Sequence, residues 1–126
     1  MKLRVELPLP PRELSPNHTV GSKFGRMGRA RKTKKYRFDA GLAVKIALAE
    51  QEFACLFPWA GAMVQATFYF KDARRRDKDN LLASIKAAFD GLQDAGVIQD
   101  DCCITHQPVL VLNNQKDPHV LLEIWR

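Results

Sequence analysis

Two pairs of carboxylates flank one segment of the chain and could together bind a metal ion. Asp77 and Asp79 are separated by a single residue, and Asp100 and Asp101 close the same segment. In an extended chain, side chains two residues apart leave the backbone on the same side. Two carboxylates that converge in this way repel each other unless a cation neutralises them. Mg²⁺, or alternatively Mn²⁺, fits these oxygen ligands better than zinc or calcium does.

Positive charge lies directly beside these carboxylates. Arg74, Arg75 and Arg76 precede Asp77 without a gap, and Lys86 follows Asp79 by seven residues. Seven residues are two helical turns, so Lys86 can lie on the same helix face as Asp79. There it could stabilise negative charge that develops on a phosphate. The pattern predicts a phosphodiester site with metal ligands Asp77, Asp79, Asp101 and Asp100, of which the first three and Lys86 are expected to be catalytic.

A purely structural explanation exists for each of these residues. Asp79 or Asn80 could cap the following helix, which contributes roughly 1 kcal/mol. Asp101 could be a turn residue, and Lys86 could extend along the helix surface into solvent. For any one residue the structural explanation is preferred. The three adjacent arginines make the metal-dependent site the better interpretation of the whole set.

A second concentration of positive charge lies between Gly21 and Phe38. This run holds eight Lys and Arg residues and no acid, with Gly21, Gly25 and Gly28 among them. We expect a basic loop over residues 17–35, either solvated and mobile or, preferably, folding onto a phosphate backbone. The residues expected to bind DNA are Asn17, Arg31, Lys32, Lys34, Lys35, Arg74, Arg75 and Arg76.

Length and composition agree with a nucleic-acid partner. The chain has 126 residues and a formal net charge of +6, which favours polyanions, and its length suits one domain over residues 1–126. No signal peptide or membrane-length apolar run is apparent. The three cysteines, Cys55, Cys102 and Cys103, are an odd number, typical of reduced thiols in the cytoplasm. No membrane and no small-molecule cofactor are expected.

Hydrophobic periodicity predicts the elements that must position these residues. Strands are expected over residues 2–7, 63–71, 103–112 and 119–125, with the last two forming a hairpin. A helix is expected over residues 35–57, and a second ends at Gly96. The apolar stripe of the first helix is Leu42, Ile46, Ala49, Phe53 and Leu56, and that of the second is Leu81, Leu82, Ile85, Ala88, Phe89 and Leu92.

The predicted fold is therefore α+β, a single small domain of order β-α-β-α-β-β whose mixed sheet is packed with two helices. The face of the strand over residues 63–71 that carries Val64, Ala66, Phe68 and Phe70 is expected to be buried. A strand–helix–strand excursion should return the chain to one end of the sheet, which would bring Asp101 beside Asp77 and Asp79.

The segment RRRDKDNLLASIKAAFDGLQDAGVIQDD closely resembles the RusA family of Holliday-junction resolvases, often carried by phages and prophages. Its pattern is an arginine-rich strand end, D-x-D-N-L, a helix with a lysine, then a glycine and a D-D pair. The opening ELPLPPRELSPN also resembles that family. The resemblance implies that Asp77, Asp79 and Asp101 are the metal-binding catalytic carboxylates. In the family pattern a lysine stands four residues after the second aspartate, where this chain has Ala83. Lys86 matches that lysine only if about three residues are inserted before it, which would shift it ~4.5 Å along a helix.

The resemblance also implies what the protein acts on. It predicts a homodimer whose two sites cut opposed strands of a four-way DNA junction in recombination and repair, in a bacterial or phage-encoded, nucleoid-associated protein. A chain with one such site must pair to make two symmetric incisions. Two other functions are compatible with the residues: a non-catalytic, structure-selective DNA- or RNA-binding protein, and a nuclease that prefers flaps or forks.

Overall fold

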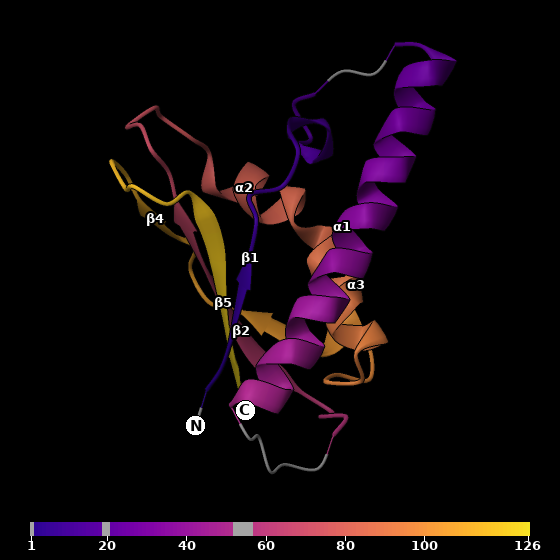
Figure 1. Ribbon diagram of the computed structural model, residues 1–126, viewed down its shortest axis with the longest axis vertical. Helices are drawn as coiled ribbons and strands as arrows, with labels where there is room; N and C mark the ends of the chain where they lie inside the picture. The colour runs from indigo at the N-terminus through magenta and orange to yellow at the C-terminus, as the bar shows by residue number, and fades with distance from the viewer. Residues whose placement is uncertain (1, 19–20, 52–56) are drawn as a thin grey trace.

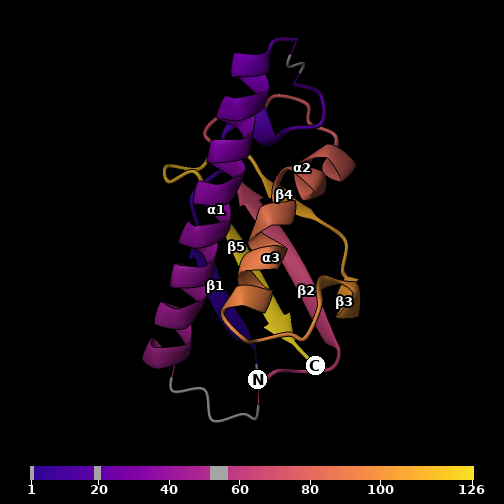
Figure 2. The same cartoon turned by 90° about the vertical axis from the view of Figure 1, so that its right-hand side faces the viewer.

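A mixed sheet of five strands organises the computed structural model, which describes residues 2–18, 21–51 and 57–126. The described helices lie on one face of this sheet (Figures 1 and 2). The strands are β1 (Leu3–Leu7), β2 (Ala62–Tyr69), β3 (Ile104–His106), β4 (Leu110–Leu112) and β5 (His119–Trp125). The helices are α1 (Lys23–Glu50), α2 (Lys78–Ser84) and α3 (Lys86–Asp94), with 3-10 turns η1 (Arg12–Leu14) and η2 (Asp101–Cys103).

The sheet combines antiparallel and parallel pairing. β5 lies between β1 and β2 and is antiparallel to both, whereas β3 and β4 each pair with β2 in parallel. These pairings confirm the predicted α+β fold with a mixed sheet. The part of the chain that the structure describes holds no helix long and apolar enough to span a bilayer.

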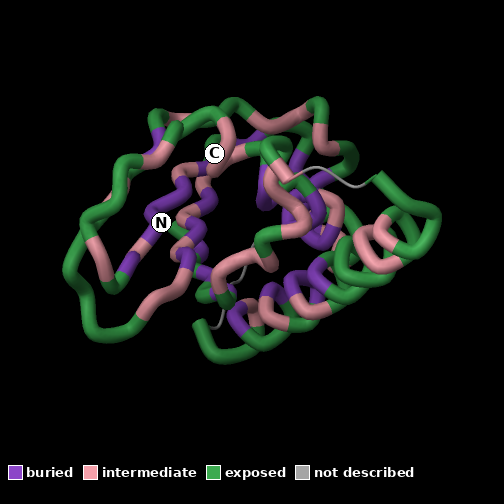
Figure 3. Tube along the Cα trace, turned by 90° about the horizontal axis from the view of Figure 1, so that it is seen from above, coloured by how far each residue is buried: buried purple, intermediate pink, exposed green. Residues whose placement is uncertain are grey.

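The core lies between the sheet and the helices, where buried segments face one another (Figure 3). The inward faces of the strands follow the alternation in the sequence, because successive side chains of a strand point to opposite faces. Val64, Ala66, Phe68 and Phe70 are all buried, as predicted. In β1 the burial pattern alternates strictly, with Leu3, Val5 and Leu7 inside.

The predicted basic loop is wrong over most of its length. Residues 23–35 form the first half of α1, a helix of 28 residues whose cap is Ser22; the Ser22 hydroxyl accepts the backbone N–H of Gly25 at 3.0 Å. Lys, Arg and Ala are good helix formers, and Lys35 pairs with Asp39 one turn later at 2.7 Å. Helix propensity therefore outweighs the repulsion between the basic side chains.

The expected buried stripe of α1 is also wrong. Leu42, Ile46 and Ala49 are exposed, whereas Tyr36, Ala40, Gly41, Val44 and Ala47 form the buried face. Phe53, Leu56 and Cys55 lie outside the described residues. The predicted end of the helix at position 57 is wrong, because α1 ends at Glu50 with Gln51 as its C-cap.

Close packing of α1 on α3 explains why the small residues Ala40 and Gly41 belong to the buried face. A Cβ atom on Gly91 of α3 would lie 2.8 Å from the carbonyl oxygen of Arg37 and 2.9 Å from the backbone nitrogen of Gly41. Backbones that approach this closely leave no room for leucine or isoleucine side chains between them. Leu42 and Ile46 consequently face outward.

The second predicted helix is present in two parts. Ile85, with φ −108° and ψ 17°, separates α2 from α3. The predicted cap at Gly96 is confirmed, since this glycine has φ +81° and donates its N–H to the carbonyl of Gln93 at 3.0 Å. The N–H of Val97 completes the motif by bonding to the carbonyl of Leu92 at 3.1 Å.

The predicted strand over residues 103–112 and its hairpin need correction. Pro108 lies between β3 and β4, and because proline has no N–H to donate, the ladder on β2 is interrupted there. The last strand, β5, pairs with β1 and β2 rather than with β4, so no hairpin forms. The connecting loop is attached to the end of β2, where Gln115 donates its N–H to the carbonyl of Phe70 at 2.8 Å.

Candidate active site

Asp77 ends the extended segment after β2 and starts α2. Its Oδ1 accepts the backbone N–H groups of Asp79, at 2.9 Å, and Asn80, at 3.4 Å. The helix cap is therefore Asp77, and the expectation that Asp79 or Asn80 serves as the cap is wrong. Both hydrogen bonds end on the same oxygen, so the cap does not use Oδ2 of Asp77.

A cleft of about 320 Å³ runs along α2 and α3, and three of the predicted catalytic residues line it. Asp79 comes from the first turn of α2, Lys86 from the start of α3, and Asp101 from η2. The remaining walls are Leu82, Ala83, Phe89, Ile104 and His106. The structure thus places an acidic residue of the D-x-D pair, the lysine and an acidic residue of the D-D pair around one hollow.

Asp77 and Asp100 do not line this cleft. Asp77 lines a neighbouring cavity, and Asp100 caps η2 by accepting the N–H of Cys102 at 3.2 Å. Among the described residues, no three potential ligands are grouped closely enough to hold a metal ion. The cleft therefore offers two carboxylates, Asp79 and Asp101, rather than the four that the sequence suggested.

The route by which Asp101 reaches the cleft differs from the expected one. Because β3 pairs with β2 in parallel, Ile104 lies opposite Ala62, at the start of β2. Asp77 and Asp79 instead follow the other end of β2, so the carboxylates do not meet at a single sheet end. Asp79 and Asp101 still line the same hollow, because α2 and α3 run back along the sheet and carry Asp79 and Lys86 toward η2.

Charges around the cleft act on one another. A hydrogen bond with the Asp100 side chain raises the pKa of Asp101, and partial burial and the negative charges of Asp100 and Asp90 add to the effect. The ammonium group of Lys86 opposes this shift. The backbone N–H of Cys102 instead lowers the pKa of Asp100. The ionised form of the Asp101 carboxyl is thus disfavoured unless a cation is near.

Asp90 and His106 were not identified from the sequence. Asp90 follows Lys86 by four residues, a spacing that puts both on one helix face and could have indicated its place near Asp101. His106 lines the cleft against the ring of Phe89, at 4.7 Å between centroids, and partial burial lowers its pKa. A lone histidine in a short strand carries no comparable sequence signal.

Of the three arginines, Arg76 is held by the protein itself. Its guanidinium lies 3.6 Å from the centroid of the Phe70 ring, and its Nη2 is 2.7 Å from Oδ1 of Asp72. Arg74 also pairs with Asp72, at 3.0 Å. Hydrogen bonds from Arg76 and Arg74 lower the pKa of Asp72 to about 2. Arg75 is exposed, and no ion pair to it occurs in the described part of the chain.

The other residues expected to bind DNA lie on α1 and in the proline-rich loop. Lys32 pairs with Glu13 at 2.8 Å and Lys35 with Asp39 at 2.7 Å, whereas Arg31 and Lys34 are exposed without an ion pair among the described residues. Asn17 lines the same cavity as Asp77. The basic half of α1 extends beyond the sheet (Figure 1).

A model of the family described as Endodeoxyribonuclease RusA matches residues 8–125. The chain belongs to the RusA family. No relative among the curated proteins matches the chain. The RusA match spans every element from η1 to β5, and therefore the whole of the cleft. Membership supports endodeoxyribonuclease activity and, with it, a role in the resolution of Holliday junctions.

The helix break places both candidate positions for a lysine on the same cleft. Ala83, the position that the family pattern indicates, and Lys86, three residues later, line the same cleft on either side of Ile85. The break itself is fixed by Ile85, whose side chain is fully buried. Lys86 therefore faces the hollow in spite of its altered distance from Asp79 in the sequence.

Proposed function

We propose that the protein is a metal-dependent endonuclease that resolves Holliday junctions and related branched DNA by paired nicks. The observation that carries this proposal is the cleft in which Asp79, Lys86 and Asp101 come together from three different elements. Membership of the RusA family supports the same reaction. Such an enzyme would act on DNA in the cytoplasm of a bacterium, encoded by the chromosome or by a phage.

The donor chemistry of the cleft fits Mg²⁺, and Mn²⁺ as a substitute. Mg²⁺ needs only one or two protein carboxylates, because waters and substrate phosphates supply its other ligands. Asp79 and Asp101 would hold it, with Asp77 at the start of the same helix as a further carboxylate. The raised pKa of Asp101 also favours a cation there, since a nearby positive charge stabilises the ionised form.

The residues of the chain would divide the work of hydrolysis. A bound Mg²⁺ supplies Lewis acidity, which polarises a phosphodiester and activates water. Asp79 and Asp101 would hold that ion in the cleft, where it would offset their repulsion of the attacked phosphate. Lys86 contributes a positive charge that offsets the negative charge growing on the phosphate or on the leaving oxygen. The walls formed by Leu82 and Phe89 limit access of bulk water to these groups.

Binding to DNA would rest on backbone charge rather than on base reading. The net charge of +6 and the exposed Arg31, Lys34 and Arg75 provide phosphate contacts that carry little sequence information. We propose that two copies of the chain bind one junction, because a homodimer with two-fold symmetry presents two active sites to two opposed strands.

Cleavage of a synthetic four-way junction by the wild type and by Asp79→Asn tests the proposal. The wild type should nick two opposed strands with Mg²⁺ or Mn²⁺ and stop when EDTA removes the metal. Asp79→Asn should cut about 10²–10³-fold more slowly, the cost typical of losing one group that stabilises the transition state. Its affinity for the junction in EDTA should stay within a factor of two or so.

The same assay separates the other functions. A wild type that binds the junction tightly and never cuts it, with either metal, would be a structure-selective binding protein. Faster cutting of flaps or forks than of four-way junctions would indicate a nuclease of different preference. Linear duplex of the same sequence is the control for binding that depends only on charge.

A further inference from the structure

The cavity on the other side of α2 has the chemistry of a nucleotide pocket. It encloses about 440 Å³, within the roughly 300–1,000 Å³ range of sites for small ligands. Asp77 lines this cavity, whereas Asp79 lines the active-site cleft. We propose that the cavity takes one unstacked nucleotide that adjoins the phosphodiester to be cut. The proposal rests on the nuclease function above and adds a second binding site to it.

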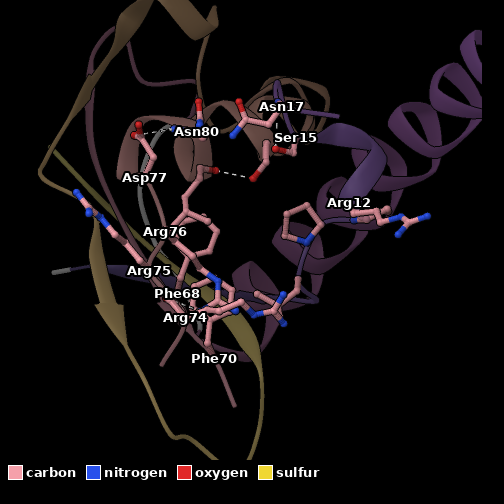
Figure 4. A pocket seen from close by; sticks show the side chains of 15 residues that line it. Arg12, Ser15, Asn17, Phe68, Phe70, Arg74, Arg75, Arg76, Asp77 and Asn80 are labelled. Atoms are coloured by element: carbon pink, nitrogen blue, oxygen red, sulfur yellow. Dashed lines mark hydrogen bonds between the residues drawn. The ribbon is translucent and has the colours of Figure 1, made fainter. Parts of the chain in front are cut away.

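One end of the cavity offers a prepared stacking surface. There the Arg76 guanidinium lies over Phe70, as Figure 4 shows, and only 20% of the Arg76 side chain is exposed. The Asp72 carboxylate and the Arg74 carbonyl, 3.2 Å from Nη1, fix its orientation. Guanidinium planes stack on bases, and one that is already immobilised loses little entropy when a base arrives. The outer face of Arg76 can therefore hold a base.

The opposite end of the cavity is polar. Asn17, Asn80 and Asp77 line that end of the cavity (Figure 4). Each amide supplies both donors and an acceptor, the groups that recognise the edge of a base. Asn17 belongs to a turn in which its own backbone N–H bonds to the hydroxyl of Ser15 at 3.3 Å. This hydrogen bond helps to fix the backbone of Asn17 before DNA binds.

The sides of the cavity complete the match to a nucleotide. The apolar walls between the two ends are formed by Pro10, Pro11 and Leu81. The backbone φ of each proline is fixed by its ring. Arg12 lines the rim of the cavity with its side chain turned outward (Figure 4), where it could meet a phosphate outside the cavity. An apolar ligand would leave the arginine and the amides unmatched, and a small anion would leave the apolar walls empty.

A branched substrate can supply such a nucleotide at low cost. Extruding a base from a duplex costs a few kcal/mol, and the cost is smallest where pairing is already disturbed, as at the branch point of a junction. A strand that crosses the start of α2 would put one base into the cavity and the adjoining phosphate beside Asp77 and Asp79. The pocket thereby links recognition of the branch to the position of the cut.

A scan of modified junctions tests the pocket with the full-length protein. Each junction carries one abasic site or one 2-aminopurine at successive positions around the cut. Loss of the occupying base should weaken binding in EDTA by about 5- to 150-fold at one position, the equivalent of the roughly 1–3 kcal/mol that stacking one base contributes. At that position, adjacent to the cut bond, 2-aminopurine fluorescence should rise when protein binds.

Two variants assign the effect to the cavity. Asn17→Leu removes the polar contact, and Ser15→Trp fills the space; both should abolish the position dependence and the fluorescence rise. Gln93→Ala, an exposed amide at the far end of α3, is the matched control and should behave as the wild type. Circular dichroism and the unfolding midpoint of each variant exclude misfolding as the cause.

The outcomes distinguish this pocket from the nuclease function. Cleavage of every junction with no position dependence beyond twofold, and no fluorescence rise, would refute the pocket and leave the nuclease intact. A wild type that never cuts would refute the nuclease, while the binding and fluorescence scans in EDTA would still decide whether a base enters the cavity. A position dependence that survives in both variants would place the base elsewhere and refute the assignment.

Discussion

Asp77 combines a structural duty with a proposed catalytic one. Its Oδ1 caps α2, and its carboxylate charge lies next to the cleft residue Asp79. An asparagine at this position keeps a capping oxygen and loses the charge, whereas alanine loses both. The two substitutions can therefore separate the contribution of Asp77 to stability from its contribution to the reaction.

We predict that Asp77→Asn leaves the free energy of unfolding almost unchanged and slows junction cleavage about 100-fold or more. Asp77→Ala should slow cleavage equally and also lower the free energy of unfolding by about 1 kcal/mol, through loss of the cap. Urea denaturation and single-turnover cleavage measure the two effects. Wild-type cleavage by Asp77→Asn would mean that Asp77 serves α2 alone.

The position of the lysine can be tested by moving it. Lys86→Ala should slow cleavage by about 10²–10³-fold, because the cleft loses its positive charge. Adding Ala83→Lys to that variant should restore part of the rate, since position 83 lines the same cleft about one turn earlier. Lys45→Ala, an exposed lysine on α1, serves as control in the same assay. Absence of any rescue would show that reaching the cleft is insufficient and that the height along the helix matters.

At the scale of elements, the buried face of β2 was predictable from the sequence and that of α1 was not. Alternation in β2 identifies its buried face directly, because only the side of the sheet facing the helices forms the core. In α1 the large apolar residues suggested one face, yet Gly41 and Ala40 are buried because α3 comes so close. That approach depends on Gly91, fifty residues away in the sequence, which no local pattern contains.

The contact between α1 and α3 predicts opposite effects of two similar substitutions. Gly91→Ala should lower the free energy of unfolding by about 1–3 kcal/mol, because its Cβ would meet backbone atoms that cannot move aside easily. Gly28 also lies in a helix, but a Cβ added there would have nothing within 4 Å. Gly28→Ala should therefore raise the free energy of unfolding by roughly 0.5–1 kcal/mol. Urea denaturation compares the two. A stable Gly91→Ala protein would mean that α1 and α3 can separate without loss.

The candidate site shows the same division between local and distant information. Asp79, Lys86 and Asp101 could be proposed as a group from residue types and spacing, together with the family resemblance. Their meeting place could not, because it depends on the parallel register that sets Ile104 opposite Ala62. The fixed stack of Arg76 on Phe70 likewise joins side chains whose partnership is visible only once the strand end has folded.

At the scale of the molecule, the arrangement of charge matters more than its sum. The basic half of α1 is a rigid helix that extends beyond the sheet (Figure 1), so its cations keep a fixed spacing instead of adapting as a loop would. Two of them, Lys32 and Lys35, are already neutralised by Glu13 and Asp39. Phosphate contacts should therefore depend on the exposed cations that have no carboxylate partner among the described residues.

Salt dependence of junction binding tests this view with two double variants of equal charge. Arg31→Ala with Lys34→Ala should make the slope of log affinity against log salt concentration shallower by about 1.8, or ~0.9 for each lost phosphate contact. Lys32→Ala with Lys35→Ala removes the same number of charges from the same helix, but from residues paired at 2.8 and 2.7 Å, so its slope should change much less. Both proteins have a formal net charge of +4, from +6 less two cations, so net charge cannot account for a difference. Equal slopes for the two variants would contradict the assignment, because binding would then respond to total charge and not to the exposed side of α1.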